Sequence, residues 1–95
     1  MKWYNNKSTD DLLVIFSRIG HEAVAYAIQG DFKKSEILLD EFLEKFDEVI
    51  PRIVDTKAEF YNYNQEIYNS WEKCHRDLWS IKRSMMNQLE IAFNK

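Results

Sequence analysis

The fold is decided by residues 27–41, which read AIQGDFKKSEILLDE. Gly30 favours a left-handed helix end, and Asp31 directly after it is a strong N-cap for a following helix. Because the link spans only one or two residues, the segments on either side are predicted to form an antiparallel helical hairpin. The rest of the chain can be interpreted outward from this turn.

The helix before the turn is expected to cover residues 9–29. Ser8 or Thr9 can cap it, and the acidic residues that follow favour the positive end of the helix dipole. Gly20 interrupts its apolar face, and we expect a neighbouring helix to cross closely there. The apolar residues recur at helical spacing and are Leu12, Phe16, Ile19, Ala23, Tyr26 and Ala27.

The helix after the turn is expected to cover residues 31–50, with apolar residues on one side and acids on the other. Ile37 and Leu43 lie off the main apolar stripe and widen it, which suggests contact on more than one side. Pro51 can occupy the first turn of a third helix or kink a continuous one. A bend or short turn between residues 50 and 56 is favoured, with Asp55 or Thr56 as a cap.

Residues 56–93 contain no obvious breaker and predict a third helix that is longer than the other two. Its apolar residues follow a heptad-like pattern, and its extra length is expected to pair with another chain. The predicted fold is therefore all-α: one domain over residues 1–95, with a helical hairpin and a long third helix in a coiled-coil-like three-helix bundle that dimerises. The heptad positions are Phe60, Ile67, Cys74 and Ile81, with Trp71, Leu78, Met85 and Ala92 four residues later.

Charge is distributed unevenly along the chain. The formal net charge of −3 argues against nucleic acid as a partner. Residues 31–50 hold seven acids against three lysines, whereas residues 72–95 hold five bases against three acids. These regions can attract each other, within one molecule or between two, or form two solvated faces. A single cysteine and the absence of a signal peptide or apolar span predict a soluble, cytoplasmic protein.

No catalytic, cofactor-binding or metal-binding site is expected, and the chain is predicted not to be an enzyme. Glu72 and His75 have the spacing used in di-iron bundles, but the sequence contains no second such pair. Cys74 is interpreted as a small core residue because it lies in the apolar seam of the third helix. A nucleophilic cysteine would need a histidine that reaches its sulfur, and the neighbouring His75 points about 100° away around the helix. No small-molecule substrate is expected.

The candidate functional residues are aromatic or flexible apolar side chains outside the predicted core. They are favoured at interfaces, where one end of the side chain is apolar and the other is wet, although they can also cover the edge of the core. The predicted function is a non-enzymatic protein-binding module (a chaperone, an adaptor or a small inhibitor of a larger assembly) that binds through the C-terminal half of its long third helix. The alternative is a self-assembling structural component of a phage or secretion apparatus. The partner-binding residues are Tyr61, Tyr63, Tyr68, Trp79, Met86 and Phe93.

The run from Ala27 to Glu41 resembles the first helix hairpin of the FliT-type flagellar export chaperones, which share its Gly-Asp-aromatic turn and leucine-rich acidic helix. That resemblance implies a last helix that contacts a secreted client. Phe42 stands where that family usually has arginine. The run is also similar to the helical IIA components of lactose/cellobiose phosphotransferase systems. Ile50 occupies the place of their phosphorylated histidine, so this second resemblance implies a related fold without phosphotransfer.

Overall fold

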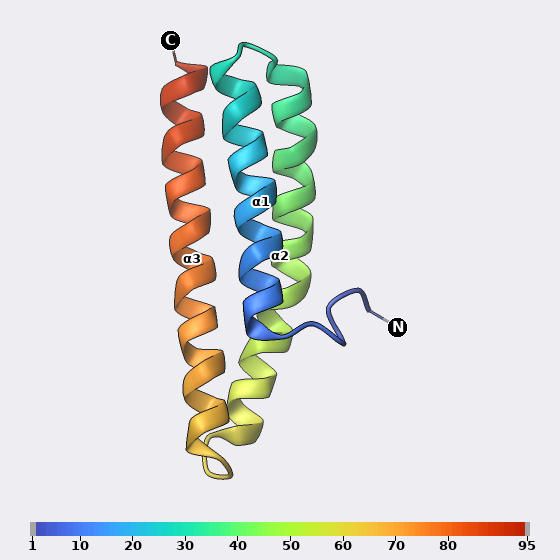
Figure 1. Cartoon of the computed structure of the whole chain (residues 1–95), viewed down its shortest axis with the longest axis vertical. Helices are drawn as coiled ribbons and strands as arrows, with labels where there is room; N and C mark the ends of the chain where they lie inside the picture. Colours follow the sequence, from blue (N-terminus) through green and yellow to red (C-terminus); the bar gives the residue numbers. More distant parts are fainter. Residues whose placement is uncertain (1, 95) are drawn as a thin grey trace.

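The computed structural model describes residues 2–94, which form three α-helices packed side by side (Figure 1). Helix α1 spans Thr9–Ile28, α2 spans Phe32–Phe60 and α3 spans Gln65–Phe93. The chain runs up α1, down α2 and up α3, so consecutive helices are antiparallel (Figure 1). No strand occurs in residues 2–94. The prediction of an all-α, three-helix bundle is confirmed.

Local capping explains both ends of α1 as predicted. The Ser8 hydroxyl accepts a hydrogen bond from the Asp11 amide at 3.1 Å, and the Asp11 carboxylate accepts one from the Ser8 amide at 3.2 Å. Gly30 has a φ of 86°, which glycine adopts without a steric penalty. The Asp31 side chain then accepts from the amide of Lys34 at 3.2 Å and caps α2.

The expected turn between residues 50 and 56 is absent, because Pro51 lies inside α2. Burial keeps the helix continuous at this point: Val49, Ile53 and Thr56 form one buried face on both sides of the proline. The apolar contacts of that face offset the amide hydrogen bond that proline cannot donate. The boundaries predicted for the second helix (31–50) and the third (56–93) are therefore wrong.

The chain turns at residues 61–64, where no break was predicted. Asn64 caps α3 by accepting a hydrogen bond from the amide of Ile67 at 3.1 Å. The segment Tyr61-Asn62-Tyr63-Asn64 did carry a signal, since asparagine is a favoured N-cap and turn residue. Consequently α2 and α3 have 29 residues each, and the third helix does not exceed the second.

Three buried phenylalanines form the centre of the core. The ring of Phe16 on α1 lies 5.1 Å from that of Phe42, and 6.0 Å from that of Phe46. Cys74 is buried among the core residues, as predicted. At Gly20 an added Cβ would lie 3.6 Å from the Met85 sulfur, an ordinary van der Waals distance. The close helix crossing that we expected at this glycine is therefore not what requires it.

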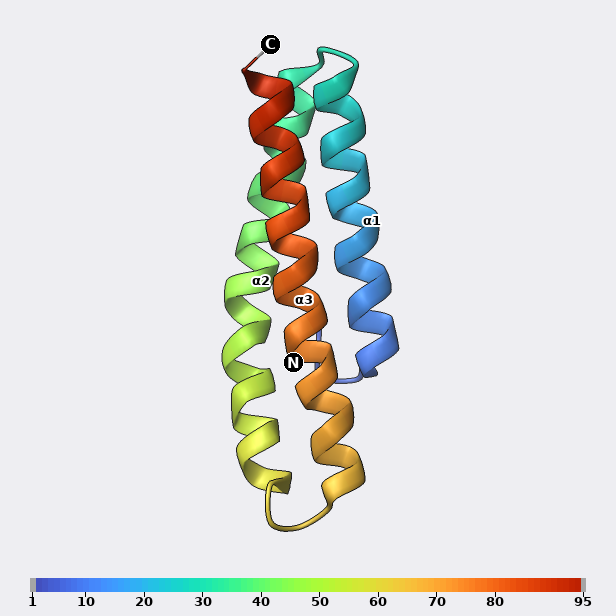
Figure 2. The ribbon, with the colours of Figure 1, turned by 90° about the vertical axis from the view of Figure 1, so that its left-hand side faces the viewer.

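The lower ends of α2 and α3 extend past the start of α1 as a two-helix hairpin (Figures 1 and 2). The segment before α1 folds back onto α2, where the indole of Trp3 donates to the Glu48 carboxylate at 3.1 Å. None of the helices in residues 2–94 is long and apolar enough to cross a membrane. Because α1 packs against one side of the α2–α3 pair, the opposite side of that pair faces away from α1 along its whole length (Figures 1 and 2).

Candidate protein-interaction site

The surface that α2 and α3 form on the side away from α1 is here called the outer seam. Three ring contacts set its register: Phe32 with Phe93 at 5.3 Å, Phe46 with Trp79 at 5.0 Å and Tyr61 with Tyr68 at 5.3 Å between centroids. Helical spacing places the remaining positions between these pairs. The α2 row is Phe32, Leu39, Leu43, Phe46, Ile50, Lys57 and Tyr61, and the α3 row is Tyr68, Glu72, His75, Trp79, Lys82, Met86 and Phe93.

The outer seam collects most of the partner-binding residues predicted from the sequence, with Tyr63 as the exception. Tyr63 lies in the turn after α2, is 83% exposed, and its ring lies 6.0 Å from that of Phe60. The others lie on the seam, where Trp79 is 42%, Met86 39% and Phe93 38% exposed. These three side chains recur every seven residues along α3, so they form one straight row.

The α2 side of this surface was missed by sequence reasoning. Phe32, which was not singled out, is 43% exposed and packs its ring against that of Phe93. Leu43 lies on the outer seam, as its position off the main stripe suggested, whereas Ile37 lies on another side of α2, near Tyr26 of α1. The signal was the widened apolar face of the second helix. The widened face did not indicate which helix would pack against it.

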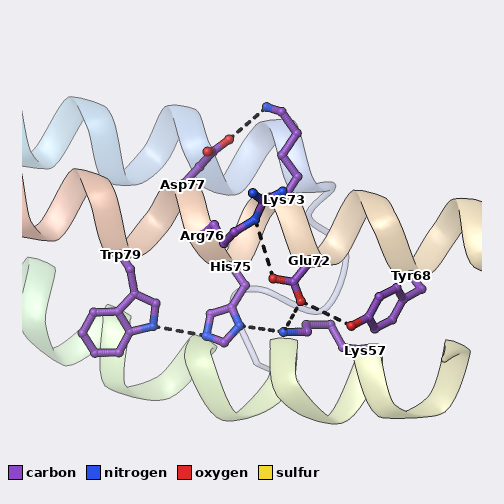
Figure 3. A network of polar contacts seen from close by, with 8 residues as sticks. All are labelled: Lys57, Tyr68, Glu72, Lys73, His75, Arg76, Asp77 and Trp79. Atoms are coloured by element: carbon purple, nitrogen blue, oxygen red, sulfur yellow. Dashed lines mark hydrogen bonds and ion pairs between the residues drawn. The ribbon is translucent and has the colours of Figure 1, made fainter.

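A network of polar side chains crosses the lower half of the outer seam (Figure 3). The Lys57 ammonium on α2 lies 2.7 Å from the Glu72 carboxylate on α3. The Tyr68 hydroxyl donates to the same carboxylate at 3.4 Å, and Arg76 Nε lies 3.6 Å from its other oxygen. Glu72 therefore contacts three partners, accepting from Lys57 on the neighbouring helix and from Tyr68, and forming an ion pair with Arg76.

His75 contacts a donor on each of its ring nitrogens. The Trp79 indole N–H donates to Nε2 at 3.1 Å, and the Lys57 Nζ lies 3.0 Å from Nδ1 (Figure 3). An indole N–H and an ammonium group can only donate, whereas a neutral imidazole has one acceptor nitrogen. A neutral His75 therefore accepts from Trp79 or from a charged Lys57, but never from both. A protonated ring accepts from neither.

The same surroundings perturb two pKa values. Burial, assisted by the charge of Lys57 and opposed by Glu72, lowers the pKa of His75 below its ordinary value. The hydrogen bond from Lys57, together with its charge, lowers the pKa of Glu72, although partial burial opposes this shift. At neutral pH the network therefore contains a carboxylate and an uncharged imidazole.

Charged residues of opposite sign flank the two sides of the outer seam. Glu36, Asp40 and Asp47 are exposed along α2, and Arg76 and Arg83 are exposed along α3. Among residues 2–94, no ion pair joins these acids of α2 to bases of α3. The attraction that the sequence suggested between these two regions is thus not realised as contacts within one copy of the chain.

The reactive groups are placed unfavourably for nucleophilic or metal chemistry. Burial raises the pKa of the Cys74 thiol to about 11, so at neutral pH the side chain is an uncharged thiol. Cys74 faces α1, with its sulfur 3.8 Å from the Thr9 carbonyl oxygen, whereas His75 lies on the outer seam. Within residues 2–94, no three histidine, cysteine or acidic side chains form a group that could hold a metal ion.

Comparisons with known proteins identify no relative of this chain. No known protein family matches the chain, and neither do any curated proteins or solved structures. The resemblances to export chaperones and to phosphotransferase components stay predictions from one stretch of sequence.

Proposed function

We propose that this chain is a non-enzymatic protein-binding module that receives a helix of another polypeptide on the outer seam. The single observation that carries the proposal is the row of Trp79, Met86 and Phe93, each about 40% exposed and spaced by one heptad. A second helix can place its own apolar residues between members of such a row, as in a coiled coil. Phe32 completes the surface from α2.

The proposal places the protein among chaperones, adaptors and small inhibitors of larger assemblies. The row of Trp79, Met86 and Phe93, with charged residues on both sides of the outer seam, has the apolar centre and polar rim that are typical of protein interfaces. Methionine at its centre adapts to partners of different shape. The buried, reduced Cys74 suits a reducing compartment, which supports a cytoplasmic location.

Affinity capture tests the proposal directly. The wild-type chain, a Met86→Glu variant and an Ile91→Glu control are used as baits in one lysate. Both positions are on α3 and exposed, Met86 at 39% on the outer seam and Ile91 at 65% off it. We expect one dominant protein with wild type and with the control, and its loss with Met86→Glu. Equal capture by all three baits contradicts binding on this surface.

A second candidate function, self-assembly as a structural component, is favoured by the charged flanks of the outer seam. Acids on α2 and bases on α3 are complementary between two copies of the same chain. Light scattering over a concentration series separates a closed oligomer, whose mass reaches a plateau, from an open assembly, whose mass continues to grow.

A further inference from the structure

We propose that the occupant of the outer seam is the same seam of a second copy, related by a twofold axis parallel to the helices. This inference rests on the proposed function, because it uses the same surface and names the polypeptide that covers it. The signs of the flanking charges, their heights along the helices and the size of the surface all favour this arrangement.

The charge signs select one of two possible twofold arrangements. A twofold interface brings the same patch of both copies together. If the axis runs along the helices, α2 of each copy faces α3 of the other, and Asp40 and Asp47 face arginines. If the axis runs across the helices, α2 faces α2 and α3 faces α3, so charges of like sign meet. Like charges across an interface suppress association, so the parallel arrangement is favoured.

The heights of the charged residues agree with the parallel arrangement. Phe32 is level with Phe93, and Phe46 is level with Trp79, with equal residue separations on the two helices. By this register Arg83 is level with Phe42, within one turn of Asp40, and Arg76 is level with Val49, within one turn of Asp47.

A twofold axis along the helices keeps these heights between copies. Asp40 of one copy therefore meets Arg83 of the other, and Asp47 meets Arg76, and symmetry repeats both pairs. Arg76 also lies 3.6 Å from Glu72 of its own helix, but its side chain is 72% exposed and free to bridge the two acids. Glu90 is the exception, because it is level with Ser35 and faces Glu36 of the other copy.

The surface is large enough for a stable dimer. Each of α2 and α3 has 29 residues. At 1.5 Å per residue and a diameter of about 10 Å per helix, the two-helix face measures roughly 44 by 20 Å. That is on the order of 800–900 Å² per copy, which matches the area that each partner contributes to a standard stable interface.

Sedimentation equilibrium of the full chain tests the inference, with capture experiments run on the same variants. We expect a dimer whose dissociation constant rises with salt, because the flanking pairs are screened. Met86→Glu should give a monomer, and Ile91→Glu should leave the dimer unchanged. Arg83→Asp should raise the dissociation constant roughly tenfold or more, since it turns each of two symmetric attractions into a repulsion.

Two further charge variants decide the orientation. Adding Asp40→Arg to Arg83→Asp should restore the dimer. The two charges of each symmetric pair are then exchanged, so opposite charges meet again. Glu90→Lys should tighten it, because it converts the facing acids into an attractive pair. If Asp40→Arg alone tightens the dimer and the double variant does not restore it, the copies are antiparallel and the proposed arrangement is wrong.

The outcomes also separate this inference from the proposed function. A wild-type chain that stays monomeric, yet captures another protein that Met86→Glu loses, overturns the second copy as occupant and leaves the proposed function standing. If the wild-type chain is a dimer and Met86→Glu leaves it unchanged, the second copy binds elsewhere and the proposed dimer on the outer seam is wrong. If capture is unaffected as well, the proposed function fails too.

Discussion

The ammonium of Lys57 and the imidazole of His75 lie 3.0 Å apart across the outer seam, yet they share a hydrogen bond only when Trp79 does not use the same ring. His75 thus either connects α3 to α2 through Lys57 or bonds to Trp79 in the next turn of α3. No other titratable pair in the network has this property, because the Glu72 carboxylate can accept from several donors together.

Stability should fall as the pH drops from 7.5 to 5. The pKa of His75 is lowered in the folded state, so between the folded value and the ordinary value of about 6.5 the unfolded chain binds more protons. The stabilisation is complete above about pH 6.5 and is lost as the pH falls through the folded pKa. Urea unfolding followed by tryptophan fluorescence at several pH values measures this loss.

The control for this pH dependence is the other histidine. His21 is exposed on α1, so His21→Gln should keep the wild-type profile, whereas His75→Gln should flatten it between pH 5 and 7.5. The charged groups around His75 are Lys57 from α2 and, from α3, Glu72, Arg76, Asp77 and Arg83. The pKa of Glu72 is lowered, so its stabilisation is lost only below about pH 4.5, outside this window. A sloping profile in His75→Gln would remove His75 as the cause.

Trp79→Phe should shift the tautomers of neutral His75 toward the one that carries its proton on Nε2. The phenyl ring can still pack against Phe46, but it has no N–H to donate to Nε2. The neutral ring is then free to carry its proton on Nε2 and to accept from Lys57 at Nδ1. Long-range ¹H–¹⁵N NMR spectra of the histidine ring distinguish the two tautomers. An unchanged tautomer would show that Trp79 does not control the ring.

The double variant Trp79→Ala with Phe93→Ala should abolish association while leaving helicity nearly intact. Both side chains are about 40% exposed, so their truncation should cost the monomer about 1–3 kcal/mol in total, well short of unfolding it. Circular dichroism checks the helicity, and light scattering checks the mass. If the variant instead loses its helical signal, these residues act as core and the interface is elsewhere.

Pro51→Ala should stabilise the protein by about 1–3 kcal/mol, because Pro51 lies inside α2 and is exposed. Alanine restores the amide donor toward the carbonyl of Asp47 without removing a buried side chain. Thermal unfolding measures the gain. A neutral or destabilising result would indicate that a turn, rather than a continuous helix, occupies this point.

Gly20→Ala should stabilise the protein by about 0.5–1 kcal/mol, since alanine is the better helix former. The new methyl group would lie 3.6 Å from the Met85 sulfur and 3.7 Å from the ring of Phe42, so no neighbour has to move. Urea denaturation gives the difference in unfolding free energy. Destabilisation would show that α1 and α3 approach more closely at this point than these distances indicate.

Local capping chemistry could be interpreted correctly from sequence because each signal lies within a few residues of its effect. Ser8 with Asp11 begins α1, and Gly30 with Asp31 joins α1 to α2, as expected from residue type alone. The spacing of Trp79, Met86 and Phe93 by seven residues likewise places them in one row from their positions in the sequence alone. The partners of that row on α2 were not identified.

Tertiary contacts decided the features that sequence reasoning placed wrongly or missed. Proline and asparagine both signal a break, and burial of Ile53 and Thr56 decided that the chain continues through Pro51 and turns at residues 61–64 instead. Lys57 lies on α2 whereas Glu72 and His75 lie on α3, so only the register between these two helices brings the three side chains together. By itself the sequence determined three amphipathic segments and one turn, because those depend on neighbours along the chain. The outer seam depends on contacts between distant residues, so only the packed helices determine it.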